Sequence, residues 1–315
     1  MPDPMTASLI REPLSSMQIH KIPLKGNIPN DFQSRGRGFV HSKGAPVPTM
    51  LITGVSSGIG NALVRRVAAE PGWTVIGTVR TVKPPSEHGL PDATFLYSFE
   101  ASDADAAAAL AGRILAEHGC PDVIVNNAGY VLYGPVEETP LERIRDLYQV
   151  NVFSPISLIQ EFLPTMRSRG SGTIVNVTSL GGRLVFPFFT NYNSTKHAME
   201  GYSEGLWHEL KPFGIRVKAV EPGYVATPIY RAMDDRAKPT GPYAKSLSAM
   251  NRFSESITNR STPEQAAEET WRAISDASDK LRYPIAAYAR VMVRARALVG
   301  SMTFMRFMNR QWLGK

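Results

Sequence analysis

Short apolar runs recur along the chain and alternate with longer segments whose apolar residues repeat at helical spacing. The runs 123–125 and 173–177 are almost continuously apolar, which is typical of parallel strands covered on both faces. The predicted strands are 49–53, 73–79, 93–98, 122–126, 172–178 and 214–220, with a short seventh strand at 282–286. The pattern predicts an α/β fold, a single doubly wound parallel sheet of about seven strands with helices on both faces.

Helices are expected between the strands, and three of them have bounds that the sequence predicts. The segment 104–118 is rich in alanine and is predicted to form a helix with Ser102 or Asp103 as its N-cap. A long helix is expected over 140–166, with a kink at Pro155. A third helix is expected over 192–211.

Composition divides the chain into three parts. Residues 1–47 show no periodic pattern, so we expect a largely disordered leader. Residues 48–285 carry the alternation of strands and helices and form one domain. Residues 286–315 are expected to form a basic, amphipathic helical tail. From Lys280 to Lys315 there are eight basic residues and no acidic one, and the whole chain has a net charge of +7.

The apolar residues of the tail need a cover, because Met302, Met305 and Met308 recur every third position beside Phe304 and Phe307. A basic helix with an apolar face can lie on an anionic membrane, so peripheral membrane contact is one alternative. We favour packing over the substrate cleft or at the contact of a homo-oligomer. No nucleic-acid partner is expected, since no base-reading motif accompanies the charge.

Cysteine usage and hydropathy narrow the class of protein. The chain has 315 residues, of which 43% are hydrophobic, enough to bury a large core. The single cysteine, Cys120, excludes a disulfide framework and a cysteine-based zinc site, and no metal is expected. It also favours a reducing compartment, so a cytoplasmic protein is expected. No run of apolar residues is long enough to predict a membrane-spanning helix.

A glycine-rich segment, T-G-V-S-S-G-I-G, follows the first predicted strand and precedes a helical pattern. Strand, glycine turn and helix form the setting in which a pyrophosphate can bind at a helix N-terminus. We expect Gly54 to permit the tight turn, Gly58 to let phosphates approach the backbone, and Gly60 to let helix and strand pack closely. The spacing differs from the G-x-G-x-x-G of the common fingerprint.

Tyr192 and Lys196 are four residues apart, which places them on one face of a helix. An ammonium group beside a phenol is expected to lower the pKa of the phenol, so that it can exchange a proton near neutral pH. Ser179, at the end of a predicted strand, can hold a carbonyl or hydroxyl oxygen. Together these side chains suit reversible hydride transfer between an alcohol and a ketone.

The order of motifs resembles the short-chain dehydrogenase/reductase family, including its steroid and retinol dehydrogenase members, over about residues 48–285. The motifs are the glycine segment, N-N-A-G at 126–129, the Tyr-Lys pair and P-G at 222–223. The resemblance implies a Rossmann-type fold and a catalytic tetrad of Asn151, Ser179, Tyr192 and Lys196. It also implies that Lys196 binds the nicotinamide ribose and that Asn151 anchors a water.

NADP(H) is expected as the cofactor rather than NAD(H), because Arg80 stands where an acid would hold the ribose 2′-hydroxyl of NAD. An arginine fork can pair with a 2′-phosphate, and Lys83 adds charge nearby. By the resemblance, Glu100 lies near the adenine and Thr227 near the nicotinamide carboxamide or the phosphates. The residues expected to hold the cofactor are Gly54, Ser56, Ser57, Gly58, Ile59, Gly60, Arg80, Glu100, Asn127, Ala128, Gly129, Tyr192, Lys196, Pro222, Gly223, Val225 and Thr227.

A small-molecule carbonyl or alcohol is the expected substrate, and aromatic residues near the site favour an apolar, steroid-, retinoid- or lipid-like one. Tyr133, Phe186, Ser179 and Tyr192 are its expected contacts. The segment 224–262 should form a lid that contributes apolar side chains, namely Ile229, Tyr230, Met233, Tyr243 and Met250.

Two other functions are considered. A non-enzymatic NADP(H) sensor on the same fold would not need Ser179 and Tyr192 together. A sugar-nucleotide epimerase or dehydratase would have a G-x-x-G-x-x-G turn and a larger C-terminal domain, and the sequence has neither. An oxidoreductase is therefore the favoured function.

Overall fold

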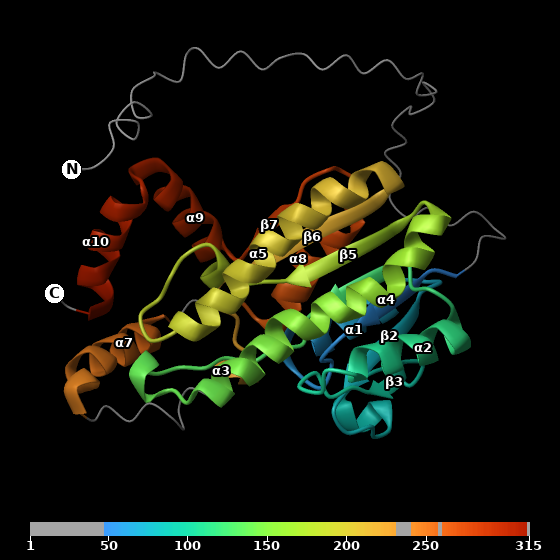
Figure 1. The fold of residues 1–315 in the computed structure, drawn as a ribbon, viewed down its shortest axis with the longest axis horizontal. Coiled ribbons are helices and arrows are strands. Elements are labelled where there is room, and N and C mark those ends of the chain that lie inside the picture. Colours follow the sequence, from blue (N-terminus) through green and yellow to red (C-terminus); the bar gives the residue numbers. More distant parts are fainter. Residues whose placement is uncertain (1–46, 231–240, 258–259, 314–315) are drawn as a thin grey trace, which may run out of the picture. The chain divides into compact units, whose positions relative to one another are not determined.

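The computed structural model describes residues 47–230, 241–257 and 260–313, all within one compact unit, Arg37–Lys315. The expected leader, apart from Val47, and Met233 of the expected lid lie outside the described residues. Figure 1 shows a single sheet with helices on both of its faces. Among the described residues, no helix has both the length and the apolar character needed to cross a membrane.

The sheet has seven parallel strands in the order β3-β2-β1-β4-β5-β6-β7, which confirms the predicted fold class. The order reverses at β1, so β1 and β4 form the switch point where ligands of such sheets bind. The strands are β1 (Thr49–Ile52), β2 (Thr74–Val79), β3 (Phe95–Ser98), β4 (Val123–Asn126), β5 (Gly172–Val177), β6 (Ile215–Pro222) and β7 (Arg282–Ile285).

Alternate residues of the central strands face opposite layers of helices. Leu51 packs with α2 (Ala106–His118), α4 (Ser154–Arg169) and α5 (Thr190–Leu210). Met50 and Ile52 pack on the other face, with α1 (Gly58–Ala68) and α8 (Pro263–Ser275). Burial on both faces explains why these strands are continuously apolar.

Two predicted helix features are wrong in detail. The N-cap of α2 is Asp105, and Asp103 instead accepts a hydrogen bond from the Asp105 amide at 3.0 Å in the preceding turn. The segment 140–166 is not one helix kinked at Pro155. A π-helical turn, Gln149–Phe153, joins α3 (Leu141–Tyr148) to α4. Pro155 has no amide hydrogen, and the wider turn before it absorbs the irregularity.

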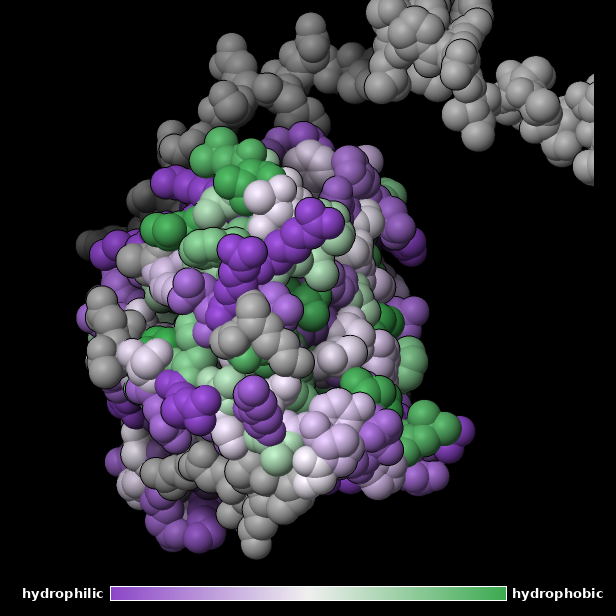
Figure 2. Space-filling view, turned by 90° about the vertical axis from the view of Figure 1, so that its left-hand side faces the viewer, coloured by the Kyte–Doolittle hydropathy of each residue, from purple (hydrophilic) through white to green (hydrophobic). Residues whose placement is uncertain are grey.

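The C-terminal tail forms two helices, α9 (Ala287–Val299) and α10 (Ser301–Leu313), rather than one. α10 packs against α7 (Ala244–Ser256) and buries Phe304, Met308 and Trp312 in a third apolar cluster. Met302 and Met305 are exposed, because the buried face follows a spacing of four residues rather than three. Figure 2 views this side, where hydrophobic residues are interspersed with hydrophilic ones.

Candidate active site

The glycine turn, defined here as Thr53–Gly60, connects β1 to α1 at the carboxyl end of the sheet. Gly54 and Gly58 have φ angles of 72° and 63°, which residues with a side chain rarely adopt. A Cβ on Gly54 would lie 2.9 Å from Cα of Ala128 in the segment after β4. A Cβ on Gly58 would lie 3.2 Å from Cγ2 of Thr227. The turn therefore packs against two of the other segments expected to hold the cofactor.

Glycine is required at position 60 because the Gly54 carbonyl and the Asn127 side chain approach it closely. The sequence predicted a different reason, the packing of helix against strand. A Cβ on Gly60 would lie 2.5 Å from the Gly54 carbonyl oxygen and 2.5 Å from Nδ2 of Asn127. That amide donates hydrogen bonds to the carbonyl oxygens of Thr53 at 2.9 Å and Gly54 at 3.0 Å. The Thr53 hydroxyl accepts from the backbone amides of Asn127 and Ala128. Asn127 thus holds the turn in shape.

The start of α1 fits the pyrophosphate of a dinucleotide. Its N-cap, Ser57, makes no side-chain hydrogen bond to the helix, and both Ser56 and Ser57 are exposed. The first amides of a helix lack intrahelical acceptors and carry a partial positive charge. Ile59, in the first turn of the helix, is half-buried, and its side chain packs against the core. These amides, on a turn whose glycines carry no side chain, form a suitable cradle for a pyrophosphate.

Arg80 follows β2 directly, and its exposed guanidinium makes no hydrogen bond or ion pair with the described part of the chain. Its backbone carbonyl accepts from the Ser98 hydroxyl at 3.0 Å, which joins the ends of β2 and β3. Lys83 is less available than expected, because it pairs with Glu87 at 3.4 Å. Glu100 lies beyond β3, and its Oε1 accepts from the Ser102 hydroxyl at 2.9 Å.

The segment Pro222–Thr227 follows β6 and passes beside the glycine turn. The Gly223 amide donates to the Ile285 carbonyl at 3.1 Å, and a Cβ on Gly223 would lie 3.2 Å from Cβ of Ala289 in α9. Val225 pairs with Ser261 in an isolated bridge. The space that a side chain at 223 would need is therefore filled by α9, a constraint that the sequence pattern did not indicate.

Ser179 and Tyr192 meet beside a small cavity of about 60 Å³. Ser179 caps the 3₁₀ turn after β5, where its hydroxyl accepts from the Gly181 amide at 2.9 Å. Tyr192 lies in the first turn of α5 and shares a hydrogen bond with Ser179. A Cβ on Gly181 would lie 2.7 Å from Oδ1 of Asn193, so the glycine allows this turn to approach α5.

The electrostatics of this pair differ from the expectation. Burial raises the pKa of Tyr192, and the hydrogen bond from Ser179 only partly opposes that rise. The expected lowering of the Tyr192 pKa by Lys196 does not outweigh this burial. Burial also lowers the pKa of Lys196 itself, to about 8, and Glu200 opposes that shift less strongly. Lys196 Nζ donates to the Val177 carbonyl oxygen at 3.0 Å and lies 5.8 Å from the ring centroid of Tyr192.

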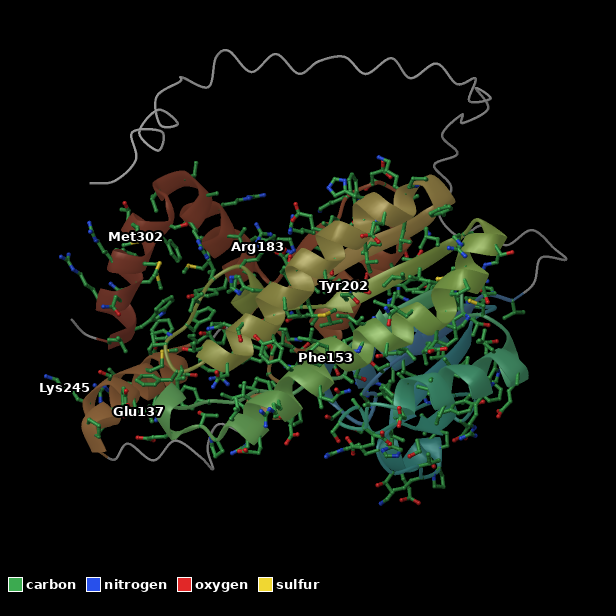
Figure 3. The ribbon with its side chains drawn as sticks, viewed as in Figure 1. Glu137, Phe153, Arg183, Tyr202, Lys245 and Met302 are labelled. Carbon is green, nitrogen blue, oxygen red and sulfur yellow. The ribbon has the colours of Figure 1, made fainter. Side chains whose placement is uncertain are left out.

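Asn151 lies inside the π-helical turn, which ends at Phe153 (Figure 3). Its Nδ2 donates to the Tyr130 carbonyl at 3.0 Å and to the Thr195 hydroxyl at 3.2 Å. Its Oδ1 accepts from the Tyr130 amide at 3.1 Å. The side chain thus joins the segment after β4 to α5. A Cβ on Gly129 would lie 3.0 Å from this Oδ1, so Gly129 allows the contact.

The cavity beside Ser179 and Tyr192 is mostly apolar and includes the expected Phe186 and Ile229. Its lining comprises Val131, Ser179, Leu180, Gly181, Phe186, Phe189, Tyr192, Asn193, Pro222, Gly223, Tyr224 and Ile229. Tyr133 does not line it; the Tyr133 hydroxyl donates to Asn251 Oδ1 of α7 at 2.6 Å. Tyr243 and Met250 belong to the apolar cluster that also contains Phe186. The side chain of Tyr230 lies outside the described residues.

Two residues in or behind the cavity lining were not predicted from the sequence. Asn193 is buried and lines the cavity, and its Oδ1 has no hydrogen-bond partner within the described part of the chain. Its place beside Tyr192 in a helix was visible, but its burial was not. Trp312 is 4% exposed and packs on Phe186, with ring centroids 5.1 Å apart. Sequence distance concealed that contact.

Comparison with known proteins identifies the family. The family model of short chain dehydrogenases matches residues 48–238, so the chain belongs to the short-chain dehydrogenase family and is an oxidoreductase. The uncharacterized oxidoreductase YusZ of Bacillus subtilis is 31% identical over 265 residues, which are 79% of this chain and 92% of YusZ.

Two further relatives agree with this assignment. An NADPH-dependent 3-dehydrocapnine reductase of Ornithobacterium rhinotracheale is 30% identical over 248 residues, 75% of this chain and 87% of the reductase. A crystal structure of a short-chain dehydrogenase from Streptomyces avermitilis is 33% identical with a TM-score of 0.71. The match covers 85% of this chain and 97% of that chain.

Proposed function

We propose that this oxidoreductase uses NADP(H) to interconvert an alcohol and a ketone or aldehyde on an apolar small molecule. The observation that carries the proposal is the meeting of Ser179 and Tyr192 beside an apolar cavity, with Lys196 behind them. The glycine turn and Pro222–Thr227 border the same edge of the sheet, as a dinucleotide site at a switch point requires.

The cofactor would be held by the glycine turn, the amides of α1 and the guanidinium of Arg80. When bound, NADP(H) supplies or accepts a hydride. No acid stands directly after β2, and Arg80 has no ion-pair partner among the described residues; both observations support NADP(H) over NAD(H). The NADPH dependence named for the Ornithobacterium relative agrees with this choice.

Tyr192 is the proposed acid and base. Because burial raises its pKa, the hydroxyl is protonated at neutral pH and can donate a proton to a carbonyl oxygen in the direction of reduction. Ser179 holds the same oxygen with its hydroxyl. Lys196 is protonated below about pH 8 and favours the phenolate that forms when the proton leaves. Asn151 keeps Tyr130 and α5 in register and has one acceptor lone pair left for a water.

An apolar substrate is supported by the lining of the cavity, where Leu180, Phe186 and Phe189 lie beside Ser179 and Tyr192. The cavity of about 60 Å³ is far smaller than typical ligand sites of about 300–1,000 Å³. The aromatic side chains must therefore move when a substrate enters. Asn193 Oδ1 offers one buried acceptor for a polar group of the substrate.

The test is consumption of NADPH and NADH with a panel of aliphatic, steroid and retinoid carbonyl compounds. We expect kcat/KM to be at least about tenfold higher with NADPH, and Arg80→Asp to remove or reverse that preference, because it places repulsion at the 2′-phosphate. Arg113→Asp, on the exposed face of α2, is the matched control and should keep it. A tenfold preference for NADH, or an unchanged preference in Arg80→Asp, would contradict the proposed cofactor.

A further inference from the structure

A second and larger cavity, of about 500 Å³, lies between α8, β7 and α9 and shares no lining residue with the catalytic cavity. Its volume lies within the range of small-molecule sites, about 300–1,000 Å³. Charged residues dominate its wall, with six basic and two acidic side chains. The lining is Arg183, Glu221, Glu269, Arg272, Lys280, Arg282, Tyr283, Pro284, Ile285, Arg290, Val293 and Arg294.

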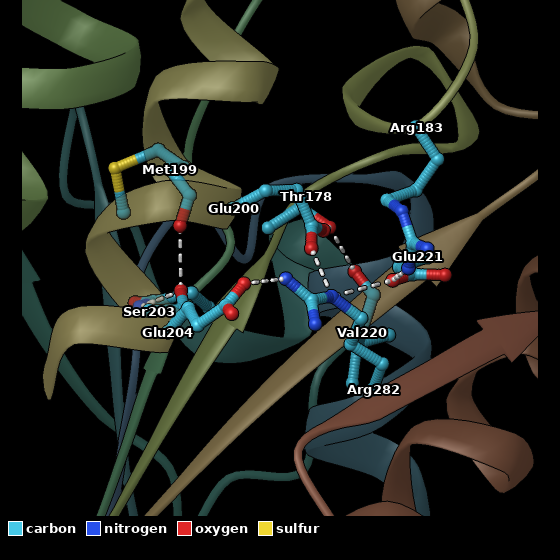
Figure 4. A network of polar contacts seen from close by, with 10 residues as sticks. Thr178, Arg183, Met199, Glu200, Ser203, Glu204, Val220, Glu221 and Arg282 are labelled. Atoms are coloured by element: carbon cyan, nitrogen blue, oxygen red, sulfur yellow. Dashed lines mark hydrogen bonds and ion pairs between the residues drawn. The ribbon is translucent and has the colours of Figure 1, made fainter. Parts of the chain in front are cut away.

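Two arginines of the cavity wall, Arg183 and Arg282, belong to a network of ion pairs with carboxylates (Figure 4). Glu221 is completely buried and pairs with Arg183 at 2.8 Å. Arg282 pairs with Glu200 at 3.0 Å and with Glu204 at 2.5 Å. The charges of Arg183 and Arg282 are thus already matched by carboxylates. The net charge of the cavity therefore depends on its other lining residues.

The rim of the cavity, defined here as Lys280, Arg290 and Arg294, carries more positive charge than the acidic side chains of the described residues match. Arg290 and Arg294 lie one turn apart on α9 and both face the cavity. Arg290 pairs with Glu269 at 2.8 Å, but Arg294 and Lys280 have no acidic partner among the described residues. Like charges at this spacing destabilise a helix, so an anion bound between the two arginines would relieve their repulsion.

The position of the rim is held from within the protein. Arg296 of α9 donates a hydrogen bond to the backbone carbonyl of Arg183, which ties the helix to the segment below it. The Ala286 amide, just before α9, donates to Glu269. Arg290 and Arg294 therefore extend from an anchored helix, and an arginine fork so held binds phosphate through paired hydrogen bonds.

We propose that this cavity is a binding site for a phosphate group, carried either by a soluble phosphate compound or by a phospholipid headgroup. Arg294 and Lys280 supply the unmatched charge, and Arg290 shares its guanidinium between Glu269 and the ligand. The site also adjoins the catalytic cavity, since Glu221 directly precedes Pro222 and Arg183 follows the turn capped by Ser179.

The first arm of the test is calorimetric titration of the full chain with inorganic phosphate at low ionic strength, where charges are little screened. We expect Arg294→Gln to weaken binding about tenfold or more, as for loss of a charge-assisted hydrogen bond. The phosphate affinity of Arg294→Lys, which keeps the charge without the guanidinium fork, should lie between those of the wild type and Arg294→Gln. Arg310→Gln, on α10 outside the cavity, is the control and should bind as the wild type does.

The second arm measures co-sedimentation with phosphatidylcholine vesicles that contain phosphatidic acid, using the same variants. Vesicle binding that Arg294→Gln abolishes and Arg310→Gln retains identifies a headgroup as the source, and titration with free phosphate alone identifies a soluble compound. The proposal is overturned if neither probe binds, or if Arg310→Gln loses as much affinity as Arg294→Gln. It is equally overturned if Arg80→Gln, rather than Arg294→Gln, abolishes phosphate binding, since the phosphate then lies in the cofactor cleft.

Discussion

The glycine turn and the aromatic wall, defined here as Phe186, Phe189, Tyr224 and Trp312, border the same site in contrasting ways. The turn consists of backbone packed so closely that a Cβ on Gly60 would lie 2.5 Å from its neighbours. The wall consists of large side chains whose ring centroids are 5.1 to 6.4 Å apart. One region has no room for an added atom, whereas the other can rearrange its rotamers.

This difference indicates how each region works. A cofactor with a fixed pyrophosphate needs a preformed cradle, so the turn is held by Asn127 and by required glycines. A substrate that enters a cavity of about 60 Å³ needs a lining that can move. The wall is also assembled from three separate parts of the chain, since Trp312 comes from α10. Mutations should therefore separate nucleotide binding from substrate binding.

The largest effect should come from Tyr192, which lies between the two regions. Tyr192→Phe removes the proton that is transferred, so turnover should fall by about 10²–10⁴-fold. NADPH affinity, measured by fluorescence titration, should change little, because the phenol does not hold phosphates. Tyr202→Phe, on the same helix but in the sheet-facing core, is the control and should keep full turnover. Substantial activity in Tyr192→Phe would remove this residue from the acid/base role.

The aromatic wall is tested by Trp312→Ala. Removing this buried ring should destabilise the packing of α10 by about 3–5 kcal/mol. Urea unfolding and tryptic cleavage at Arg306 or Arg310 measure the loss, and KM for bulky substrates should change while NADPH affinity does not. Trp312→Phe should recover most of the stability. A parallel loss of NADPH affinity in Trp312→Ala would show that the two regions are not separable.

The glycine turn is tested by the reverse experiment, Gly60→Ala. The added Cβ must displace the Gly54 carbonyl or Asn127, which should cost about 1–3 kcal/mol and weaken NADPH binding. Gly205→Ala is the matched control. Gly205 lies within α5 with no atom within 4 Å of its Cβ position, so alanine there should stabilise the helix by about 1 kcal/mol. Equal effects of both substitutions would contradict the close approach at Gly60.

The smallest effect concerns the pH dependence of the free energy of unfolding. Burial lowers the pKa of Lys196 from 10.5 to about 8, so the unfolded chain retains a proton that the folded protein releases. Stability should therefore rise with pH between about 8 and 10.5, by about 1 kcal/mol from pH 8 to pH 9.

Lys196→Met should remove that part of the slope in urea unfolding. Burial shifts the pKa of Lys218 in the same direction, so the relevant quantity is the difference between wild type and variant. Lys218→Met should remove a separate part of the slope. Identical slopes in the wild type and Lys196→Met would show that Lys196 does not titrate in this range.

The seven strands and the position of the glycine turn were predictable from the sequence, because both depend on local properties. Continuous apolar runs mark buried strands, and glycine supplies the positive φ of the turn at Gly54 and Gly58. The shared helix face of Tyr192 and Lys196 was predictable for the same reason, since a spacing of four residues places two side chains one above the other.

Only the tertiary structure decided how these local elements act on one another. Burial, which depends on every packed neighbour, raises the pKa of Tyr192 although Lys196 lies beside it. The π-helical turn forms where Asn151 joins two segments, and no local periodicity marks it. Trp312 reaches Phe186 across 126 residues of sequence because α10 folds back on α7. Such contacts follow from the path of the whole chain, which residue spacing does not encode.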